Sequence, residues 1–90
     1  MFELIFVEPA KDAFQALDEP EKVTVRRLLR IIAVDPFVDN KTKFYYPIGG
    51  DSSPLGYVDW LYEGDGFSIV YHIVGNDTVR ILGIAHSVFE

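Results

Sequence analysis

The C-terminal stretch "GFSIVYHIVGNDTVRILGIAH" limits the possible folds of this chain more than any other feature. It contains two apolar runs rich in β-branched residues, which favour strands, on either side of the turn-forming residues 75–77. If these three residues form the loop, Val74 pairs with Thr78 and His72 pairs with Arg80. A two-residue loop would shift the pairing by one residue and scatter the polar side chains over both faces. The hydrophobic pattern therefore predicts an antiparallel hairpin with the three-residue loop.

This register gives the hairpin one apolar face and one face with polar interruptions. The apolar face holds Phe67, Ile69, Tyr71, Ile73, Val79, Ile81, Gly83 and Ala85. On the other face, Val70 pairs with Leu82, Ser68 with Ile84 and Gly66 with His86. The polar residues Ser68, His72, Arg80 and His86 all lie on this second face. Because the apolar face must be covered by other elements, we expect these four polar residues on the open face of the sheet.

Ahead of the hairpin, the chain predicts a strand over residues 2–7 and then two helices. The first helix starts at Pro9, and its apolar residues recur at helical spacing: Ala10, Ala13, Phe14 and Leu17. Either Asp18 or Glu19 can cap the second helix, which Pro36 ends after about Val34. Its predicted buried stripe consists of Val25, Leu28, Leu29 and Ile32. Only a few residues separate the two predicted helices, and so short a connection predicts an antiparallel helical hairpin.

Between the helices and the C-terminal hairpin, residues 36–56 carry many turn-forming residues. Within them, "KFYYPI" at 43–48 can form a short strand, and "YVDWLYE" at 57–63 predicts another. Either alternate set of side chains in the 57–63 strand can extend the open face. The predicted fold is α+β: an N-terminal strand, a helical hairpin and a meander of three or four antiparallel strands, in a single domain of residues 1–90.

Composition narrows the class of function. The chain has no cysteine and two histidines far apart in sequence, so we expect no metal and no cofactor. It shows neither a signal peptide nor a membrane-length apolar run, which predicts a cytoplasmic protein. A net charge of −6 argues against tight binding to nucleic acid overall.

The basic residues nevertheless gather in one block, residues 22–43, which holds six bases and two acids. Three of them recur every four residues along the second predicted helix. The block consists of Lys22, Arg26, Arg27, Arg30, Lys41 and Lys43. These side chains either form an ordinary solvated surface or bind RNA, DNA or an acidic partner segment.

The whole chain resembles the RelE/ParE superfamily of toxins from bacterial type II toxin–antitoxin systems. The resemblance rests on the order of the predicted elements, on "RIIAVDP" at the end of the second helix, and on "FSIVYHI" followed by "VRILGIAH". It implies helices packed on a twisted antiparallel sheet and a cognate antitoxin as partner. It also implies one of two activities: cleavage of messenger RNA in the ribosomal A site, or poisoning of DNA gyrase without nuclease activity.

RNA cleavage by attack of the 2′-hydroxyl requires a base, an acid and a cation. The resemblance points to His86 as acid or base; Glu63 or Asp59 can supply a carboxylate, and Arg80 a cation. Ser68 stands where related nucleases commonly carry arginine. The sequence thus leaves three hypotheses: a nuclease toxin that is weakened or inactive, a gyrase poison, and a non-catalytic interaction module of the same fold.

Overall fold

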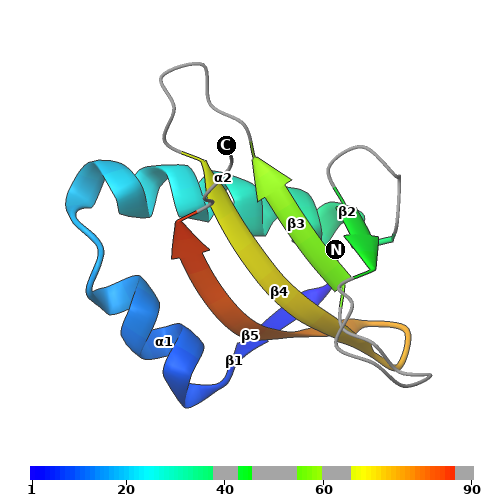
Figure 1. Ribbon diagram of the computed structural model, residues 1–90. Coiled ribbons are helices and arrows are strands. Elements are labelled where there is room, and N and C mark those ends of the chain that lie inside the picture. The colour runs from blue at the N-terminus through cyan, green and yellow to red at the C-terminus, as the bar shows by residue number, and fades with distance from the viewer. Residues whose placement is uncertain (38–42, 46–54, 60–65, 87–90) are drawn as a thin grey trace.

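The computed structural model describes residues 1–37, 43–45, 55–59 and 66–86. Two helices precede most of a five-stranded sheet (Figure 1). The elements are β1 (Glu3–Phe6), α1 (Glu8–Gln15), α2 (Glu19–Val34), β2 (Lys43–Tyr45), β3 (Leu55–Asp59), β4 (Phe67–Val74) and β5 (Thr78–His86). The strand order in the sheet is β1-β5-β4-β3-β2. The predicted α+β class and element order are confirmed.

The second helix begins where its capping residues predict. Asp18 is the N-cap: its carboxylate accepts a hydrogen bond from the Glu21 N–H at 2.9 Å, and the Glu21 carboxylate accepts one from the Asp18 N–H at 3.0 Å. This reciprocal capping box satisfies two backbone donors that a helix start otherwise leaves unpaired. The helix ends at Val34, before Pro36, as predicted.

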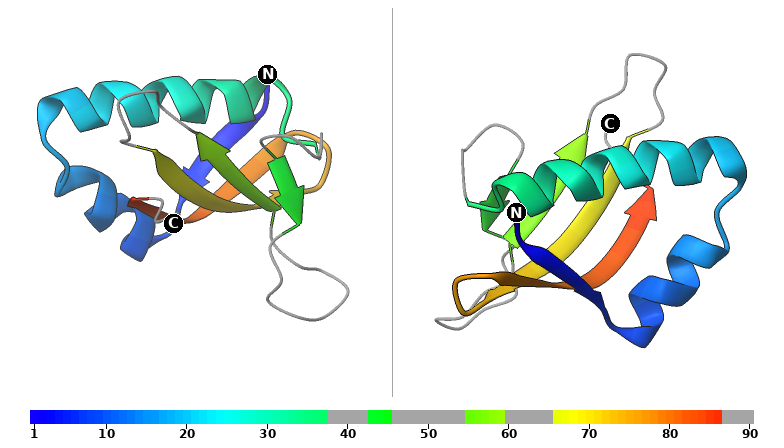
Figure 2. Two further views of the ribbon diagram at one scale, coloured as in Figure 1. Left: turned by 45° about the horizontal axis from the view of Figure 1, so that its top comes forward. Right: turned by 180° about the vertical axis from the view of Figure 1, so that it is seen from behind.

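Both helices pack on the same face of the sheet. They diverge from their connecting turn, so that α1 lies along β5 while α2 crosses the sheet toward β3 (Figures 1 and 2). The buried core between these layers comprises Ala10, Val25, Leu28, Leu29, Ile32, Phe67, Ile69, Tyr71, Val79, Ile81 and Ile84. The predicted helix stripe is therefore confirmed. The Tyr71 hydroxyl donates a buried hydrogen bond of 2.8 Å to the Pro36 carbonyl, which fastens the end of α2 to the sheet.

The N-terminal strand occupies one edge of the sheet, beside the last strand of the chain. β1 pairs with β5 in parallel, with Leu4 opposite Val79 and Phe6 opposite Ile81. A parallel neighbour requires a crossover connection, and the two helices contribute to it. The Phe2 N–H also donates to the Ala33 carbonyl at 2.7 Å, which joins the N-terminus to the end of α2.

The register of the β4–β5 hairpin follows the prediction only in the half nearest the turn. Pairing runs as predicted from Val74–Thr78 to Tyr71–Ile81 and then shifts, so that Phe67 pairs with His86. In the shifted half, Val70 pairs with Gly83, Ile69 with Ile84 and Ser68 with Ala85. The predicted pairs Val70–Leu82, Ser68–Ile84 and Gly66–His86 are wrong.

The shift is a β-bulge in which Leu82 is the additional residue. It moves Ile84 to the covered face, where this side chain is 9% exposed, and leaves Ala85 exposed. Ile has three more carbons than Ala, and burying each contributes roughly 0.8 kcal/mol. Regular alternation would have placed Gly83 and Ala85 in the core, so the bulge gives the better-filled core.

The remaining strand predictions fall partly outside the described residues. The strand predicted at 57–63 begins at Leu55, and its described part ends at Asp59. Of the segment 43–48, the described part is the strand Lys43–Tyr45. Within the part of the chain that the structure describes, no helix is long and apolar enough to cross a membrane.

Candidate functional site

His86 lies on the helix-facing side of the sheet, at the N-terminal end of α2. Its Nε2 atom is 2.6 Å from the Glu21 Oε2 atom, so the end of β5 is joined to the first turn of α2. Its ring also packs on that of Phe67, its partner across the hairpin, with centroids 4.7 Å apart. The His86 side chain remains 56% exposed, compared with 29% for Glu21. The imidazole is therefore held on two sides and still accessible to solvent.

The hydrogen bonds of Glu21 determine which nitrogen of His86 is available for chemistry. The backbone N–H of Asp18, and next the His86 side chain, hold the pKa of Glu21 below its usual value. An ionised carboxylate only accepts hydrogen bonds, so Nε2 must carry the hydrogen and donate it. The remaining ring nitrogen, Nδ1, is the atom that can exchange a proton with another molecule. The arrangement is an imidazole oriented by a carboxylate.

Arg80 lies on the opposite face of the same strand. It is exposed, and it pairs with His72 in β4 and Ile5 in β1. Five residues of β5 lie between it and His86, and the six residue steps correspond to roughly 20 Å at 3.3 Å per residue. The expectation that Arg80 and His86 share the open face is wrong, because the bulge reverses the orientation of the strand end. Glu63, the third predicted catalytic residue, lies outside the described residues.

The sequence contains one signal for this reversal: Gly83 lies inside β5, and glycine inside a strand often marks a bulge. In the structure, the buried residues of β5 are spaced by two from Val79 to Ile81 and by three from Ile81 to Ile84. The Glu21 partner of His86 was missed for a different reason: the two residues are 65 positions apart, and no local pattern links them.

The predicted basic residues of α2 divide between two flanks of the helix. Lys22 lies 3.9 Å from the Glu19 carboxylate, and the Arg26 guanidinium carbon lies 5.5 Å from the centre of the Phe14 ring in α1. Arg27 and Arg30 instead line a groove on another part of the helix. Lys41 lies outside the described residues.

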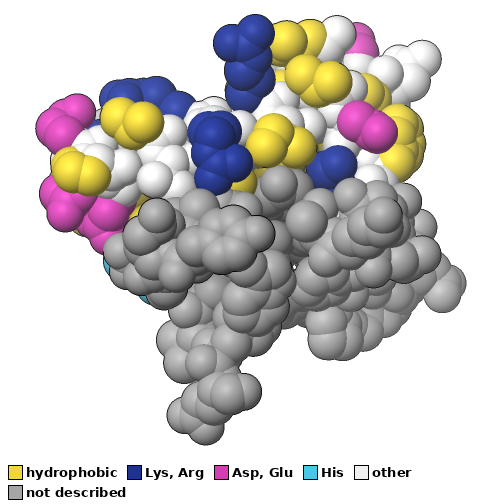
Figure 3. All heavy atoms as spheres, turned by 90° about the horizontal axis from the view of Figure 1, so that it is seen from above, with side chains coloured by type: hydrophobic (Ala, Val, Ile, Leu, Met, Phe, Trp, Pro, Cys, Tyr) yellow, Lys and Arg dark blue, Asp and Glu magenta, His cyan; other side chains and the backbone are white. Residues whose placement is uncertain are grey.

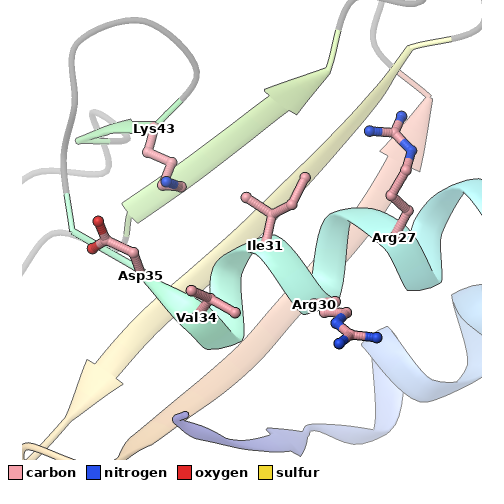
Figure 4. A pocket seen from close by; sticks show the side chains of 6 residues that line it. All are labelled: Arg27, Arg30, Ile31, Val34, Asp35 and Lys43. Atoms are coloured by element: carbon pink, nitrogen blue, oxygen red, sulfur yellow. The ribbon is translucent and has the colours of Figure 1, made fainter.

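The groove has a volume of about 320 Å³ and lies between the C-terminal half of α2 and β2 (Figure 4). Its lining residues are Arg27, Arg30, Ile31, Val34, Asp35 and Lys43. Lys43 reaches it from β2 and is only 7% exposed. Figure 3, which looks onto α2, shows basic and apolar side chains alternating along this face. Three of the predicted binding residues therefore meet here.

In the described part of the chain, no group of three or more His, Cys, Asp or Glu side chains is placed so that it could hold a metal ion. Two arrangements thus remain as candidate sites: the His86–Glu21 pair, which can orient an imidazole for proton transfer, and the basic groove, which can bind an anionic partner.

Comparison with known proteins places this fold in a defined class. No family model matches the sequence, and no curated protein matches it significantly. Among solved structures, the chain is similar to the isolated RelE toxin of E. coli, with a TM-score of 0.72 and 15% identity over 100% of this chain and 88% of that one. It is also similar to a chain of the intact E. coli RelBE toxin–antitoxin complex, with a TM-score of 0.70 and 16% identity over 99% of this chain and 100% of that one.

The protein therefore has the fold of a RelE-like toxin, as the sequence resemblance predicted. Identity of 15–16% establishes the fold alone, because one fold can carry unrelated activities.

Proposed function

We propose that this protein is the toxin component of a toxin–antitoxin pair, with a cognate antitoxin as its partner. The observation that carries the proposal is the match of the entire chain to the isolated RelE toxin at a TM-score of 0.72. The second structural neighbour, a toxin–antitoxin complex, supports a protein partner for this chain as well.

The proposed activity is ribosome-dependent cleavage of messenger RNA. In this reaction a base removes the proton from a ribose 2′-hydroxyl, its oxygen attacks the adjacent phosphorus, and an acid protonates the departing 5′-oxygen. Nδ1 of His86 would perform one of these proton transfers, and Glu63 the other. Arg80, predicted as the cation, lies roughly 20 Å from position 86 along the strand, so it cannot contact the same phosphate. The proposed nuclease is therefore a weak one.

The same separation favours a second candidate, a protein of this fold that does not cleave RNA. It would either poison DNA gyrase or act only by binding a partner. In such a protein the contact between His86 and Glu21 serves to fasten β5 to α2, and Arg80 has no phosphate to stabilise.

Induced expression in a bacterial host tests these candidates. Amino-acid incorporation, thymidine incorporation and the integrity of messenger RNA are measured separately after induction. Cleaved messenger RNA and arrested translation support the nuclease, and His86→Gln should then restore translation. His72→Gln is the matched control, because it removes the other imidazole from the opposite face.

Loss of DNA supercoiling with intact messenger RNA would instead identify a gyrase poison. Growth unaffected by a confirmed high level of folded protein would overturn the toxin proposal. Thermal melting of each variant separates loss of chemistry from loss of folding.

A further inference from the structure

The exposed side of α2 combines aliphatic and basic side chains in one row. Val23, Arg27, Arg30 and Val34 follow one another at spacings of four, three and four residues, which places them along one side of a helix. Val23 is 62% exposed and Val34 is 60% exposed. This side of α2 therefore presents both aliphatic surface and positive charge to a partner.

The C-terminal part of this row is also concave. The groove described above begins at Arg27, its aliphatic surface comes from Ile31 and Val34, and Lys43 closes the side toward β2 (Figure 4). Its volume of about 320 Å³ is at the small end of the range for binding pockets. The groove is therefore suited to receive an apolar side chain with charged groups around it.

Charge indicates what kind of molecule fits. The chain has a net charge of −6, yet the described residues that line this groove include three cations and one carboxylate, that of Asp35. Arg30 makes no hydrogen bond or ion pair with the described residues. A local positive surface on an acidic protein attracts an anionic partner and orients its approach.

One feature favours a polypeptide over RNA as this partner. The surface between the cations is aliphatic and comes from Ile31 and Val34, which suits a leucine or isoleucine side chain better than a sugar–phosphate backbone.

We propose that the groove between α2 and β2 docks an acidic segment of a partner protein. One aliphatic side chain of the segment inserts against Ile31 and Val34, and flanking carboxylates contact the exposed residues Arg27 and Arg30. The inference rests on the proposed function, since the antitoxin is the partner that this function requires. It assigns to that partner a contact surface and a chemical character.

The test begins with peptides selected from a random display library against the full chain. Selected peptides should be enriched in an aliphatic residue flanked by Asp or Glu. They should shift the backbone amide NMR signals of residues 27–35 and bind more weakly as salt concentration rises. Arg30→Glu should weaken their binding roughly five- to tenfold, and Val34→Ser should weaken it comparably.

Lys11→Glu on α1 is the matched control: it changes the net charge by the same amount on an exposed residue outside the groove and should leave binding unchanged. Failure to select acidic peptides, or binding insensitive to Arg30→Glu, would overturn the inference. So would a single-stranded oligouridylate that shifts the same amides and displaces the peptides, because RNA would then be the ligand. These results do not depend on toxicity, so either proposal can fail while the other stands.

Discussion

The two faces of the β4–β5 hairpin are built from the same two strands and differ in what fixes their side chains. On the covered face, Ile69, Tyr71 and Ile81 are completely buried against the helices. On the open face, Arg80 is exposed and His72 is half-buried, and no described helix covers them. Substitutions on the first face change packing, whereas those on the second change mainly surface chemistry.

His86 lies on the face opposite to the one that alternation predicts. Strict alternation assigns it to the open face with Arg80, but the bulge at Leu82 turns it toward Glu21 and Phe67. A single additional residue in one strand therefore places on opposite faces two side chains that would otherwise share one face. The position of a polar residue near a strand end depends on the whole register, and the alternation near the turn does not determine it.

The largest contrast between the faces is expected for adjacent residues of β5. Ile81→Ala leaves a cavity in the core and should lower the free energy of unfolding by roughly 2–5 kcal/mol. Arg80→Ala, one position earlier and exposed, should change it by less than about 0.5 kcal/mol. Urea denaturation of both variants measures the difference. Equal effects would contradict the assignment of the faces.

The bulge gives the next largest effect, at two other adjacent positions. Ile84→Ala should lower the free energy of unfolding by about 2–3 kcal/mol, because Ile84 is in the core. Ala85→Ser should have an effect below about 0.5 kcal/mol, since Ala85 is exposed. An uninterrupted alternation predicts the reverse order, so the same denaturation experiment distinguishes the two registers.

Glu21 is expected to have a smaller effect on the free energy of unfolding, which can be detected from the dependence of that free energy on pH. Its folded-state pKa is lowered, first by the Asp18 N–H and then by His86, from the usual value of 4.5. Ionised Glu21 therefore contributes stability that is present above pH 4.5 and lost as pH falls through the lower folded-state pKa. The variant Glu21→Gln can retain the capping box but has no carboxylate to protonate. It should therefore lose less stability than the wild type as pH falls below 4.5.

Denaturant titrations at a series of acidic pH values measure this difference. Glu19→Gln is the control, because it removes a carboxylate from the same helical turn, which lies 3.9 Å from the Lys22 ammonium group and is 81% exposed. If the free energy of unfolding of Glu21→Gln and of the wild type had the same pH dependence, these hydrogen bonds would not lower the pKa of Glu21 on folding.

Much of the fold follows from local sequence. Asp18, Pro20 and Glu21 specify the start of α2, and Pro36 specifies its end, because capping and the proline ring act within a few residues. The turn at residues 75–77 likewise sets the pairing of the residues nearest to it. The core residues of α2 could also be predicted, since helical periodicity alone identifies them.

The candidate sites could be predicted only in part. The basic block 22–43 contains the cations that line the groove, but charge pattern did not show that Lys22 lies near Glu19 or that Arg26 lies over the Phe14 ring of α1. The catalytic roles proposed for His86, Arg80 and Glu63 stay predictions. For these residues, sequence spacing identified suitable chemistry and could not supply relative position.

By itself, then, the sequence determined the type and order of the elements, the limits of α2 and the pairing near the hairpin turn. Only the tertiary structure decided that β1 pairs in parallel with β5, that β5 contains a bulge, and that His86 contacts Glu21. It also brought Lys43 beside Arg27 and Arg30. The reason is physical: capping, turns and periodicity act over a few residues, whereas these contacts join distant segments whose positions are set by filling one common core.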